Sequence, residues 1–328
     1  MSETTLVTGA SGFLGRHLVR LLLERGEAVR ALVRPGAELG GLERHAEIVS
    51  GRLEDDGALR AAAAGCARVF HLGGVVSHER RQLPRLRAVN VEGTRRLLAV
   101  VEPGARVVHV SSVAAVGPVS GPDERADEQH EFPPAALSLP YAATKREGEA
   151  VALEAVARGV DVVIANPGFL LGPGDVRRVS TWPVSAYLAG RLRFTTAGGL
   201  SFVDARDVAA GLVALADRGR TGERTILTGE EGNLSWRDFF ALIAEVSGVH
   251  RRTVHLPASI AVGAALLAPW LVKPDEVRAA SHWWFYAPGK AERELGFRTR
   301  PLAETVADTI ADHSLTPASR RSRSATQA

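Results

Sequence analysis

The stretch Thr4-Thr-Leu-Val-Thr8-Gly9-Ala-Ser-Gly12-Phe-Leu-Gly15 decides the fold. It has the pattern of a short apolar strand, a glycine-rich turn and the start of a helix that continues to Arg25. This order favours binding of a dinucleotide pyrophosphate, because glycines let the backbone approach the phosphates and a helix N-terminus offers unpaired N–H groups. A tight turn without a ligand is the alternative. The residues expected to hold the cofactor here are Gly9, Ser11, Gly12, Phe13, Leu14 and Gly15.

The second predicted strand, residues 28–33, is followed by Arg34 instead of an acidic residue. A carboxylate at this position binds the ribose 2′-OH of NAD, whereas an arginine suits the 2′-phosphate of NADP. We therefore expect NADP(H) to be preferred, with NAD(H) as the second choice. A surface arginine without a ligand is the alternative reading of Arg34.

Further strands alternate with helices along the chain, which predicts a parallel, doubly wound α/β sheet of the Rossmann type. The remaining strands are expected at residues 47–50, 68–71, 106–110, 161–166 and 224–228. In such a sheet, ligands bind at the C-terminal ends of the strands. The small residues Leu72-Gly73-Gly74 after the fourth strand would let a ligand approach the backbone, whereas His71 is expected to be structural.

Tyr141 and Lys145 are four residues apart in a predicted helix at 141–158, so their side chains should share one face. A neighbouring ammonium favours the phenolate, and we expect it to lower the pKa of Tyr141 toward the neutral range. Lys145 is the only lysine in the first 272 residues of a chain otherwise rich in arginine. This scarcity indicates that a compact ammonium is needed at that position.

Two other polar residues lie near predicted element ends. Ser112 follows the fifth strand, where it could donate a hydrogen bond to a substrate oxygen, although serines also cap turns. Asn90 is expected to open a helix that runs to about residue 101.

Composition excludes several classes of protein. Apolar residues make up 45% of the chain, charged residues 23%, and the net charge is only +3, which does not indicate a nucleic-acid binder. The single Cys66 rules out an internal disulfide and a multi-cysteine metal site. No secretory signal is evident, so a cytoplasmic location is expected. The apolar residues 256–272 contain prolines and are too few for a span, so we predict a buried helix and no membrane partner.

The pattern changes at Gly172, which suggests a second, smaller and partly interleaved domain. We expect residues 1–171 and 202–228 to form the dinucleotide-binding domain. Residues 172–201 and 229–313 would form the substrate domain, and 314–328 a disordered tail. The aromatic run at 283–286 is expected in the core.

Together these motifs resemble the extended short-chain dehydrogenase/reductases. They are Thr8-Gly9-x-x-Gly12-x-x-Gly15, His71-Leu-Gly-Gly74, Asn90-Val-x-Gly-Thr94, Ser111-Ser112, Tyr141-x-x-x-Lys145 and Asn166-Pro-Gly168. Two runs, Val29-Arg-Ala-Leu-Val-Arg34 and Gly65-Cys-x-x-Val-Phe-His71, are most similar to the dihydroflavonol-reductase and 3β-hydroxysteroid-dehydrogenase branch. The sequence departs from the family pattern at Arg52-Leu53, Gly73-Gly74 and Asn166, where Asp-Leu, Ala-Ala and Arg are usual.

The resemblance implies roles for these residues. Tyr141 would be the acid/base, Lys145 would assist it and hold the nicotinamide ribose, and Ser112 would polarise a carbonyl. Asn90 would support a proton relay. Further cofactor contacts are implied at Arg52, Leu53, Leu72, Gly73, Gly74, Pro167, Gly168 and Phe169.

The leading functional hypothesis is NADP(H)-dependent reduction of a ketone or aldehyde, or oxidation of the alcohol. A nucleotide-sugar epimerase or dehydratase with tightly bound NAD is the second hypothesis. A non-catalytic redox sensor is the third, but such relatives tend to lose the Tyr/Lys pair, which this chain has. The expected partner is a small carbonyl or alcohol substrate, with no metal and no nucleic acid, and a homodimer stays open.

Overall fold

The computed structural model describes residues 4–267 and 273–315. Its largest sheet has seven parallel strands in the order β10-β6-β5-β4-β1-β2-β3. They are β1 (Thr4–Thr8), β2 (Ala28–Val33), β3 (Glu47–Ser50), β4 (Cys66–His71), β5 (Arg106–Val110), β6 (Asp161–Pro167) and β10 (Arg224–Leu227). All seven predicted strands are therefore confirmed, and β10 lies at one edge of the sheet.

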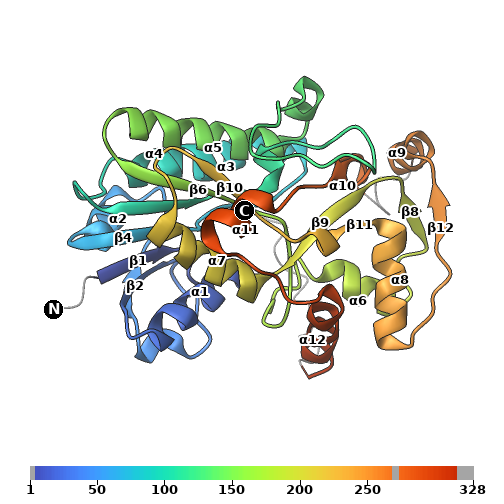
Figure 1. Ribbon diagram of the computed structural model, residues 1–328, viewed down its shortest axis with the longest axis horizontal. Coiled ribbons are helices and arrows are strands. Elements are labelled where there is room, and N and C mark those ends of the chain that lie inside the picture. Colours follow the sequence, from blue (N-terminus) through green and yellow to red (C-terminus); the bar gives the residue numbers. More distant parts are fainter. Residues whose placement is uncertain (1–3, 268–272, 316–328) are drawn as a thin grey trace.

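Helices cover both faces of this sheet, which confirms the doubly wound α/β fold (Figure 1). One face carries α1 (Phe13–Glu24), α7 (Ala205–Arg218) and α11 (Gly289–Leu295). The other carries α2 (Asp56–Ala63), α3 (Leu83–Arg87), α4 (Gly93–Leu98) and α5 (Pro140–Ala157). The strand order reverses at β1, which pairs with β2 on one side and β4 on the other. A reversal of this kind opens a crevice at the carboxyl ends of the strands.

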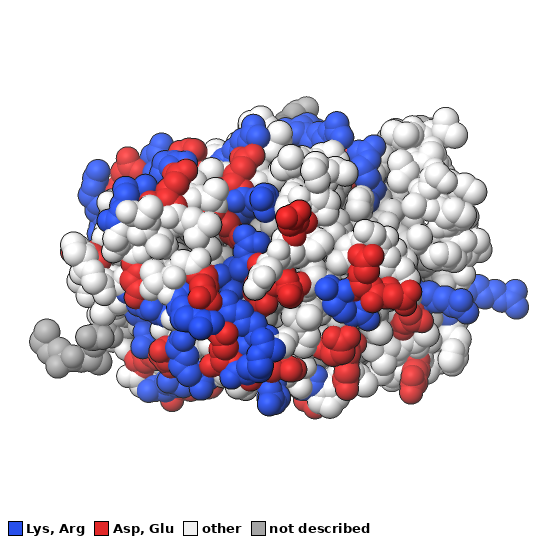
Figure 2. Space-filling view, turned by 45° about the horizontal axis from the view of Figure 1, so that its top comes forward, with Lys and Arg blue, Asp and Glu red and all other residues white. Residues whose placement is uncertain are grey.

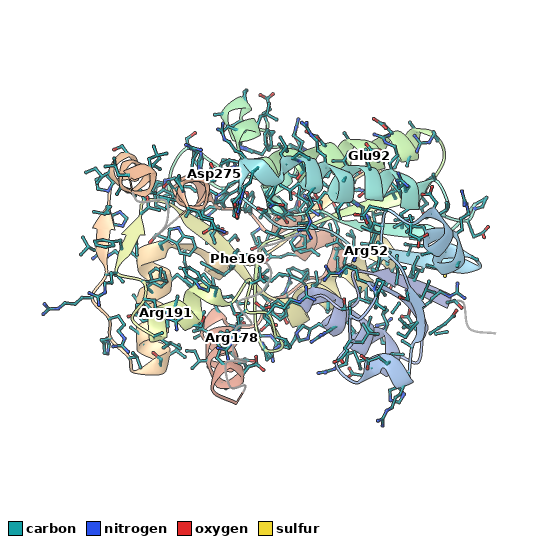
Figure 3. All side chains as sticks on the ribbon, turned by 180° about the vertical axis from the view of Figure 1, so that it is seen from behind. Arg52, Glu92, Phe169, Arg178, Arg191 and Asp275 are labelled. Atoms are coloured by element: carbon teal, nitrogen blue, oxygen red, sulfur yellow. The ribbon has the colours of Figure 1, made fainter. Side chains whose placement is uncertain are left out.

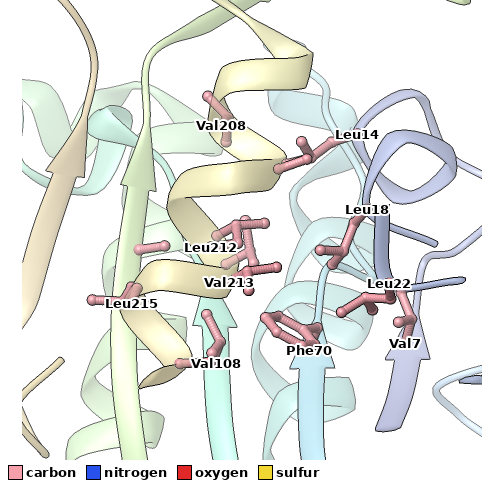
Figure 4. Packing of buried hydrophobic residues seen from close by; sticks show 14 of the residues in the cluster. Val7, Leu14, Leu18, Leu22, Phe70, Val108, Val208, Leu212, Val213 and Leu215 are labelled. Carbon is pink, nitrogen blue, oxygen red and sulfur yellow. The ribbon is translucent and has the colours of Figure 1, made fainter. Parts of the chain in front are cut away.

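The core under α1 shows how the sequence period produces this packing. Leu14, Leu18 and Leu22 recur every fourth residue, so they form one buried stripe along α1. They face Leu212 and Val213 of α7 across the layer (Figure 4). Full burial of one such side chain contributes roughly 1.5–3 kcal/mol, so this stripe holds α1, and the turn before it, firmly on the sheet.

The helix predicted to open at Asn90 begins earlier. It starts as α3 at Leu83, with Pro84 in its first turn, and continues through a π-helical turn at Ala88–Glu92 into α4. Asn90 therefore lies inside a helix, and its side chain bonds to a different segment instead of capping its own helix. The prediction that Asn90 begins the helix was wrong. Asparagine is a common N-cap, but here its side-chain amide forms hydrogen bonds with the Val75 backbone instead.

The chain after β6 contains more regular structure than predicted. The remaining strands are β7 (Phe169–Leu171), β8 (Phe194–Thr196), β9 (Gly199–Asp204), β11 (Asn233–Ser235), β12 (Val254–Leu256) and β13 (Trp283–Trp284). The helices are α6 (Trp182–Leu188), α8 (Trp236–Ser247), α9 (Ala258–Leu267), α10 (Pro274–Ala280) and α12 (Leu302–Leu315). Short 3-10 turns lie at Leu42–Arg44, Arg80–Gln82, Val113–Ala115, Pro134–Ser138 and Glu230–Gly232.

These strands form two small sheets separate from the large one: β11-β9-β13 with β7 on β9, and β12-β8. The interval 172–200 includes α6, β8 and the start of β9. Their strands of three to six residues are too short to show a clear period in the sequence. Ser235 caps α8, accepting a hydrogen bond from the Asp238 N–H at 3.1 Å.

Several other expectations can be compared with the described residues. The aromatic run at 283–286 packs into the core as expected, with Tyr286 fully buried. Cys66 is a buried free thiol. Within 4–267 and 273–315, no helix is long and apolar enough to cross a membrane, and no cluster of His, Cys, Asp and Glu could hold a metal ion. The prediction of a buried helix in the apolar stretch is wrong for its described part, because α9 buries only Ala265 and exposes Ile260, Leu266 and Leu267. Residues 268–272 of that stretch and 316–328 of the expected tail lie outside the described residues, and α12 extends to Leu315.

Candidate active site

The glycine-rich turn between β1 and α1 lies directly against the end of β4. Gly9 has a positive φ of 68°, and a Cβ added there would lie 2.7 Å from the carbonyl carbon of Leu72. A Cβ on Gly15 would lie 2.2 Å from the Gly9 oxygen. No side chain is compatible with these approaches, so both positions require glycine. The turn and the end of β4 are therefore in direct contact at the carboxyl ends of the strands.

The first turn of α1 fits a dinucleotide pyrophosphate. Gly12 is its exposed N-cap and supplies no side-chain capping bond, and no acidic residue stands in the first turn. The N–H groups there are consequently open to an anion, and the helix dipole favours one. Ser11 and Phe13 lie beside this N-terminus partly exposed, whereas Leu14 is buried, so Leu14 can offer only its backbone.

Contacts around His71 hold the end of β4 against the end of β1 and against α4. Its Nδ1 lies 2.8 Å from Thr8 Oγ1 and its Nε2 lies 3.0 Å from Thr94 Oγ1, while Thr8 also accepts from the Gly73 N–H. Burial lowers the pKa of His71 to about 3, so the ring is neutral and structural, as expected. A Cβ on Gly73 would lie 2.9 Å from Leu53, which places Leu53 against the Leu72-Gly73-Gly74 backbone.

Arg34 and Arg52 follow neighbouring strands, β2 and β3, and lie among further arginines. Burial lowers the pKa of Arg34, and the positive charges of Arg177, Arg52 and Arg85 lower it further. All four side chains are exposed, and within the described ranges none of them forms an ion pair with a carboxylate. We call Arg34, Arg52, Arg85 and Arg177 the arginine group. Its mutual repulsion would be relieved by a bound anion.

Arg85 and Arg177 were not predicted as part of the site. Arg177 belongs to a loop that is fixed on α1, because His17 Nε2 lies 2.9 Å from the Pro173 oxygen. The buried Asp175 carboxylate accepts from the N–H groups of Ser180 and Thr181 and makes the loop compact. In the sequence, Arg177 and Arg178 are an isolated pair of arginines. Nothing in that pair predicts that Arg177 lies near Arg34, which follows β2.

Tyr141 lies in the first turn of α5, half-buried, next to Ser112 at the end of β5. Burial raises the pKa of Tyr141 above its ordinary value, and a hydrogen bond with Ser112 only partly opposes this. The expected lowering by Lys145 is therefore not found. The reason is that burial dominates and that the Lys145 ammonium donates to the Val110 carbonyl oxygen at 2.9 Å. Tyr141 and Ser112 nevertheless lie within hydrogen-bonding distance of each other.

Lys145 is almost completely buried. Burial lowers its pKa to about 8, and the negative charge of Glu149 opposes the shift. The nearby His71 and His109 also have lowered pKa values, because they are buried and close to Lys145. Lys145 is therefore the positively charged group of this cluster at neutral pH.

Glu149 connects the Tyr141 helix to two strands, and sequence reasoning missed it. Its Oε1 accepts from Asn166 Nδ2 at 2.6 Å, and its Oε2 lies 2.7 Å from a guanidinium nitrogen of Arg224. Asn166 Nδ2 also donates to the Ser112 carbonyl oxygen at 2.8 Å. The available signal was spacing, since Glu149 follows Lys145 by the same four residues that separate Lys145 from Tyr141.

Asn90 fixes the segment that follows the Leu72-Gly73-Gly74 backbone. Its Oδ1 accepts from the Val75 N–H at 2.8 Å, and its Nδ2 donates to the Val75 oxygen at 3.0 Å and to Thr144 Oγ1 at 3.3 Å. Asn90 thus joins the Tyr141 helix to that segment. The same segment carries His78, an unpredicted residue whose ring meets Tyr141 edge-on at a centroid distance of 6.1 Å.

Pro167, Gly168 and Phe169 lie where the large sheet meets the smaller ones. A Cβ on Gly168 would lie 2.5 Å from the Ser201 oxygen, so β6 and β9 approach closely there. Phe169 packs edge-on against Phe202 at 5.6 Å. Figure 3 shows Phe169 near the centre of the molecule, between Arg52 on the large sheet and Arg191 on the opposite side.

The chain matches known proteins over most of its length. The model of the NAD dependent epimerase/dehydratase family matches residues 5–228. A protein of Synechocystis named dihydroflavonol 4-reductase is 35% identical over 94% of each chain. A Stigmatella aurantiaca protein named 4-hydroxy-2-methyl-3-oxo-4-farnesyl-3,4-dihydroquinoline-1-oxide ketoreductase is 32% identical over 93% of this chain and 95% of its own.

A solved structure shows the same architecture. The nucleoside-diphosphate-sugar epimerase from Pseudomonas aeruginosa is 25% identical, with a TM-score of 0.78 over 95% of this chain and 97% of that one. The family match, the reductase-named relatives and the glycine turn over a doubly wound sheet agree with one another. The chain belongs to the NAD-dependent epimerase/dehydratase family, among the extended short-chain dehydrogenase/reductases, and is an NAD(P)-dependent oxidoreductase.

Proposed function

We propose that this protein reduces a ketone or aldehyde with NADPH, or oxidises the corresponding alcohol with NADP⁺. The observation that carries the proposal is the meeting of Ser112 and Tyr141, with Lys145 on the same helix, at the sheet edge that also carries the glycine turn. The ketoreductase name of the Stigmatella relative supports carbonyl reduction as the reaction class.

The protein's own residues would handle the proton and the developing charge. The raised pKa of Tyr141 keeps its phenol protonated at neutral pH, so it can donate a proton to the carbonyl oxygen during reduction. Ser112 would hydrogen-bond the same oxygen as charge develops there. The buried Lys145 ammonium would stabilise the phenolate left on Tyr141. A bound nicotinamide cofactor supplies the hydride.

We assign the remaining predicted residues to cofactor and substrate binding within this proposal. The glycine turn would bind the pyrophosphate, and Leu53 with Leu72, Gly73 and Gly74 would line the adenosine side. Pro167, Gly168 and Phe169 would lie toward the nicotinamide. Asn90 would hold segment 75–78 at the site, a more direct reading of its three hydrogen bonds than a proton relay. Residues 172–201 and 229–313 would form the substrate domain, except that Arg177 belongs to the arginine group on the cofactor side.

The preference for NADPH follows from the arginine group. An arginine can bind a phosphate through two N–H donors, and such charge-assisted bonds are each worth about 1.5–3 kcal/mol. We expect NADPH to bind at least about tenfold more tightly than NADH, and the ratio to shrink as salt is added. Arg34→Ala should weaken NADPH and leave NADH nearly unchanged.

Fluorescence titration of both cofactors at low salt tests this expectation. Arg60→Ala is the matched control, because Arg60 is also exposed and forms no ion pair within the described ranges, but lies on α2 outside the arginine group. Equal affinities of the wild-type protein for NADPH and NADH would refute the cofactor assignment.

A nucleotide-sugar epimerase or dehydratase is the second candidate, favoured by the likeness to the Pseudomonas epimerase. Its distinguishing property would be NAD retained through purification. Absorbance and mass analysis of the purified protein therefore separate the two candidates. Retained NAD would favour the epimerase, whereas a site that binds NADPH reversibly would favour the reductase. The redox-sensor hypothesis predicts no turnover of any carbonyl compound despite cofactor binding.

A further inference from the structure

We propose that the end of the molecule formed by α9, β8 and β12 docks on the surface of an anionic lipid bilayer. We call this region the apolar end. Its exposed side chains are Phe194 (61% exposed), Val254 (53%), Ile260 (56%), Leu266 (59%) and Leu267 (82%). Figure 1 places α9, β8 and β12 together at the end opposite the first strands of the large sheet. The inference does not depend on the reaction proposed above.

Helix α9 lacks the polar face that a surface helix normally has. Residues 256–267 contain no charged side chain, and of the helix only Ala265 is fully buried. Ile260, Ala264 and Leu267 follow each other at helical spacing and form one exposed stripe. A helix of this composition on the protein surface exposes apolar area to water, which is unfavourable. Exposed apolar patches of this kind mark interaction sites.

The two-stranded sheet extends this apolar surface. Strands β8 and β12 are parallel, and Phe194 is the direct partner of Val254 in their register. Both side chains are more than half exposed. Helix α9 packs against β8, so the helix and the sheet form one continuous surface.

Arginines border the apolar end. Arg191 and Arg193 precede β8, and Arg251 and Arg252 precede β12. Because parallel strands begin at the same edge, the two loops lie side by side. All four arginines are exposed, and none forms an ion pair with a carboxylate in the described part of the chain. Figure 2 shows this end almost free of charged residues over α9, with Lys/Arg side chains projecting beside it.

This charge distribution favours a lipid surface over a second copy of the chain. A twofold interface brings the same patch of each copy together, so the arginines of the two copies would repel. Phosphate headgroups instead match the arginines, while α9 can lie at the boundary between headgroups and acyl chains. The expectation of no membrane partner would then be wrong for contact with the bilayer surface, although no helix of the described residues could span a bilayer.

Flotation with vesicles tests the proposal on the full-length protein. We expect binding to vesicles of mixed phosphatidylglycerol and phosphatidylcholine, and much weaker binding to phosphatidylcholine alone or at high salt. Ile260→Ser/Leu267→Ser should reduce binding at least about tenfold, as should Arg193→Gln/Arg252→Gln. The controls are Leu153→Ser and Arg60→Gln/Arg158→Gln, which change exposed apolar and arginine residues away from the apolar end.

Unchanged thermal unfolding and cofactor binding in each variant would show that the fold is intact. Wild-type protein that stays unbound with both kinds of vesicle would overturn the proposal, as would equal loss of binding in the controls. Self-association that Ile260→Ser/Leu267→Ser abolishes, without vesicle binding, would also overturn it and would assign the surface to a second copy.

Discussion

Tyr141 and Lys145 lie four residues apart, yet burial acts on their protons in opposite senses. It raises the pKa of the Tyr141 phenol and lowers the pKa of the Lys145 ammonium to about 8. Each shift favours the neutral form, which is the general effect of removing water from an ionisable group. At neutral pH the pair is therefore a protonated phenol beside a mostly protonated amine, which is suited to proton donation during reduction.

Tyr141→Phe should abolish turnover with little loss of cofactor affinity, because only the hydroxyl is removed. General acid/base groups typically contribute ~10²–10⁴-fold to the rate. Steady-state reduction of a model ketone, with NADPH binding measured in parallel, checks this. More than half of the wild-type kcat remaining would show that Tyr141 is not the acid.

Glu149→Gln should move the alkaline limb of the pH profile to lower pH. Lys145 loses its proton as pH rises through about 8, so kcat/KM for reduction should fall there. Removing the Glu149 charge removes the influence that raises the pKa of Lys145, so the fall should begin earlier. Glu147→Gln is the control, because Glu147 is on the same helix but pairs outward with Arg87. A uniformly lower profile with an unmoved limb would indicate a structural role only.

The helix formed by α3, the π-helical turn and α4 packs so closely on α5 that Gly148 has no room for a side chain. A Cβ on Gly148 would lie 2.8 Å from the backbone carbonyl oxygen of Asn90, which is in the π-helical turn. This approach brings Asn90 to Thr144 and positions the start of α5, where Tyr141 lies. The π-turn and Gly148 therefore act together on the geometry of the site.

Gly148→Ala should destabilise the protein by about 1–3 kcal/mol, the usual cost of overpacking, and should reduce kcat. Gly263→Ala is the matched control, because Gly263 is also helical but has no atom near its Cβ position. That variant should be neutral or more stable by up to about 1 kcal/mol. Urea unfolding of both variants measures the difference. Equal stabilities would mean that the two helices separate without cost.

At the scale of the whole molecule, an ion-pair network joins the start of α7 to the C-terminal segment. Asp204, which caps α7, pairs with Arg206 at 2.7 Å, and Arg206 also pairs with Asp308 of α12 at 2.6 Å. Arg300 pairs with Asp207 at 2.8 Å and lies 3.5 Å from Asp204. Because Asp204 ends β9, this network holds the smaller sheet, α7 and α12 in one arrangement.

Asp204→Asn should destabilise the protein by about 1–3 kcal/mol at neutral pH. Burial raises the pKa of Asp204, but bonds and charge from Arg206, with the charge of Arg300, outweigh it and hold the pKa below its ordinary 3.8. A depressed folded-state pKa stabilises the protein above that value and loses this contribution as pH falls below it. The difference between wild type and variant should therefore shrink in acid.

Asparagine caps helices as well as aspartate, so Asp204→Asn removes the charge and keeps the cap. Urea unfolding at neutral and acidic pH measures the effect. Asp308→Asn is the comparison, because Asp308 is more exposed and its loss should cost less. A difference that stays constant with pH would show that the charge of Asp204 is not what stabilises.

The sequence alone determined the seven strands of the large sheet, their parallel class and the place of the glycine turn. Through the family resemblance, it also implied that Ser112 and Tyr141 act on the same substrate. These features depend on local patterns: apolar runs, glycines in the turn after β1, and the four-residue spacing of Tyr141 and Lys145. Such patterns are readable because backbone geometry repeats over a few residues.

Only the tertiary structure decided the features that depend on distant segments. The helix that contains Asn90 begins at Leu83, and the Asn90 side chain accepts a hydrogen bond from Val75 instead of capping a helix. Arg177 lies close enough to Arg34 for its charge to lower the pKa of Arg34, and Arg224 forms an ion pair with Glu149, although long intervals of chain separate each pair. The direction of the Tyr141 pKa shift is opposite to the one predicted, because burial, which no local pattern reports, outweighs the charge that the sequence placed nearby.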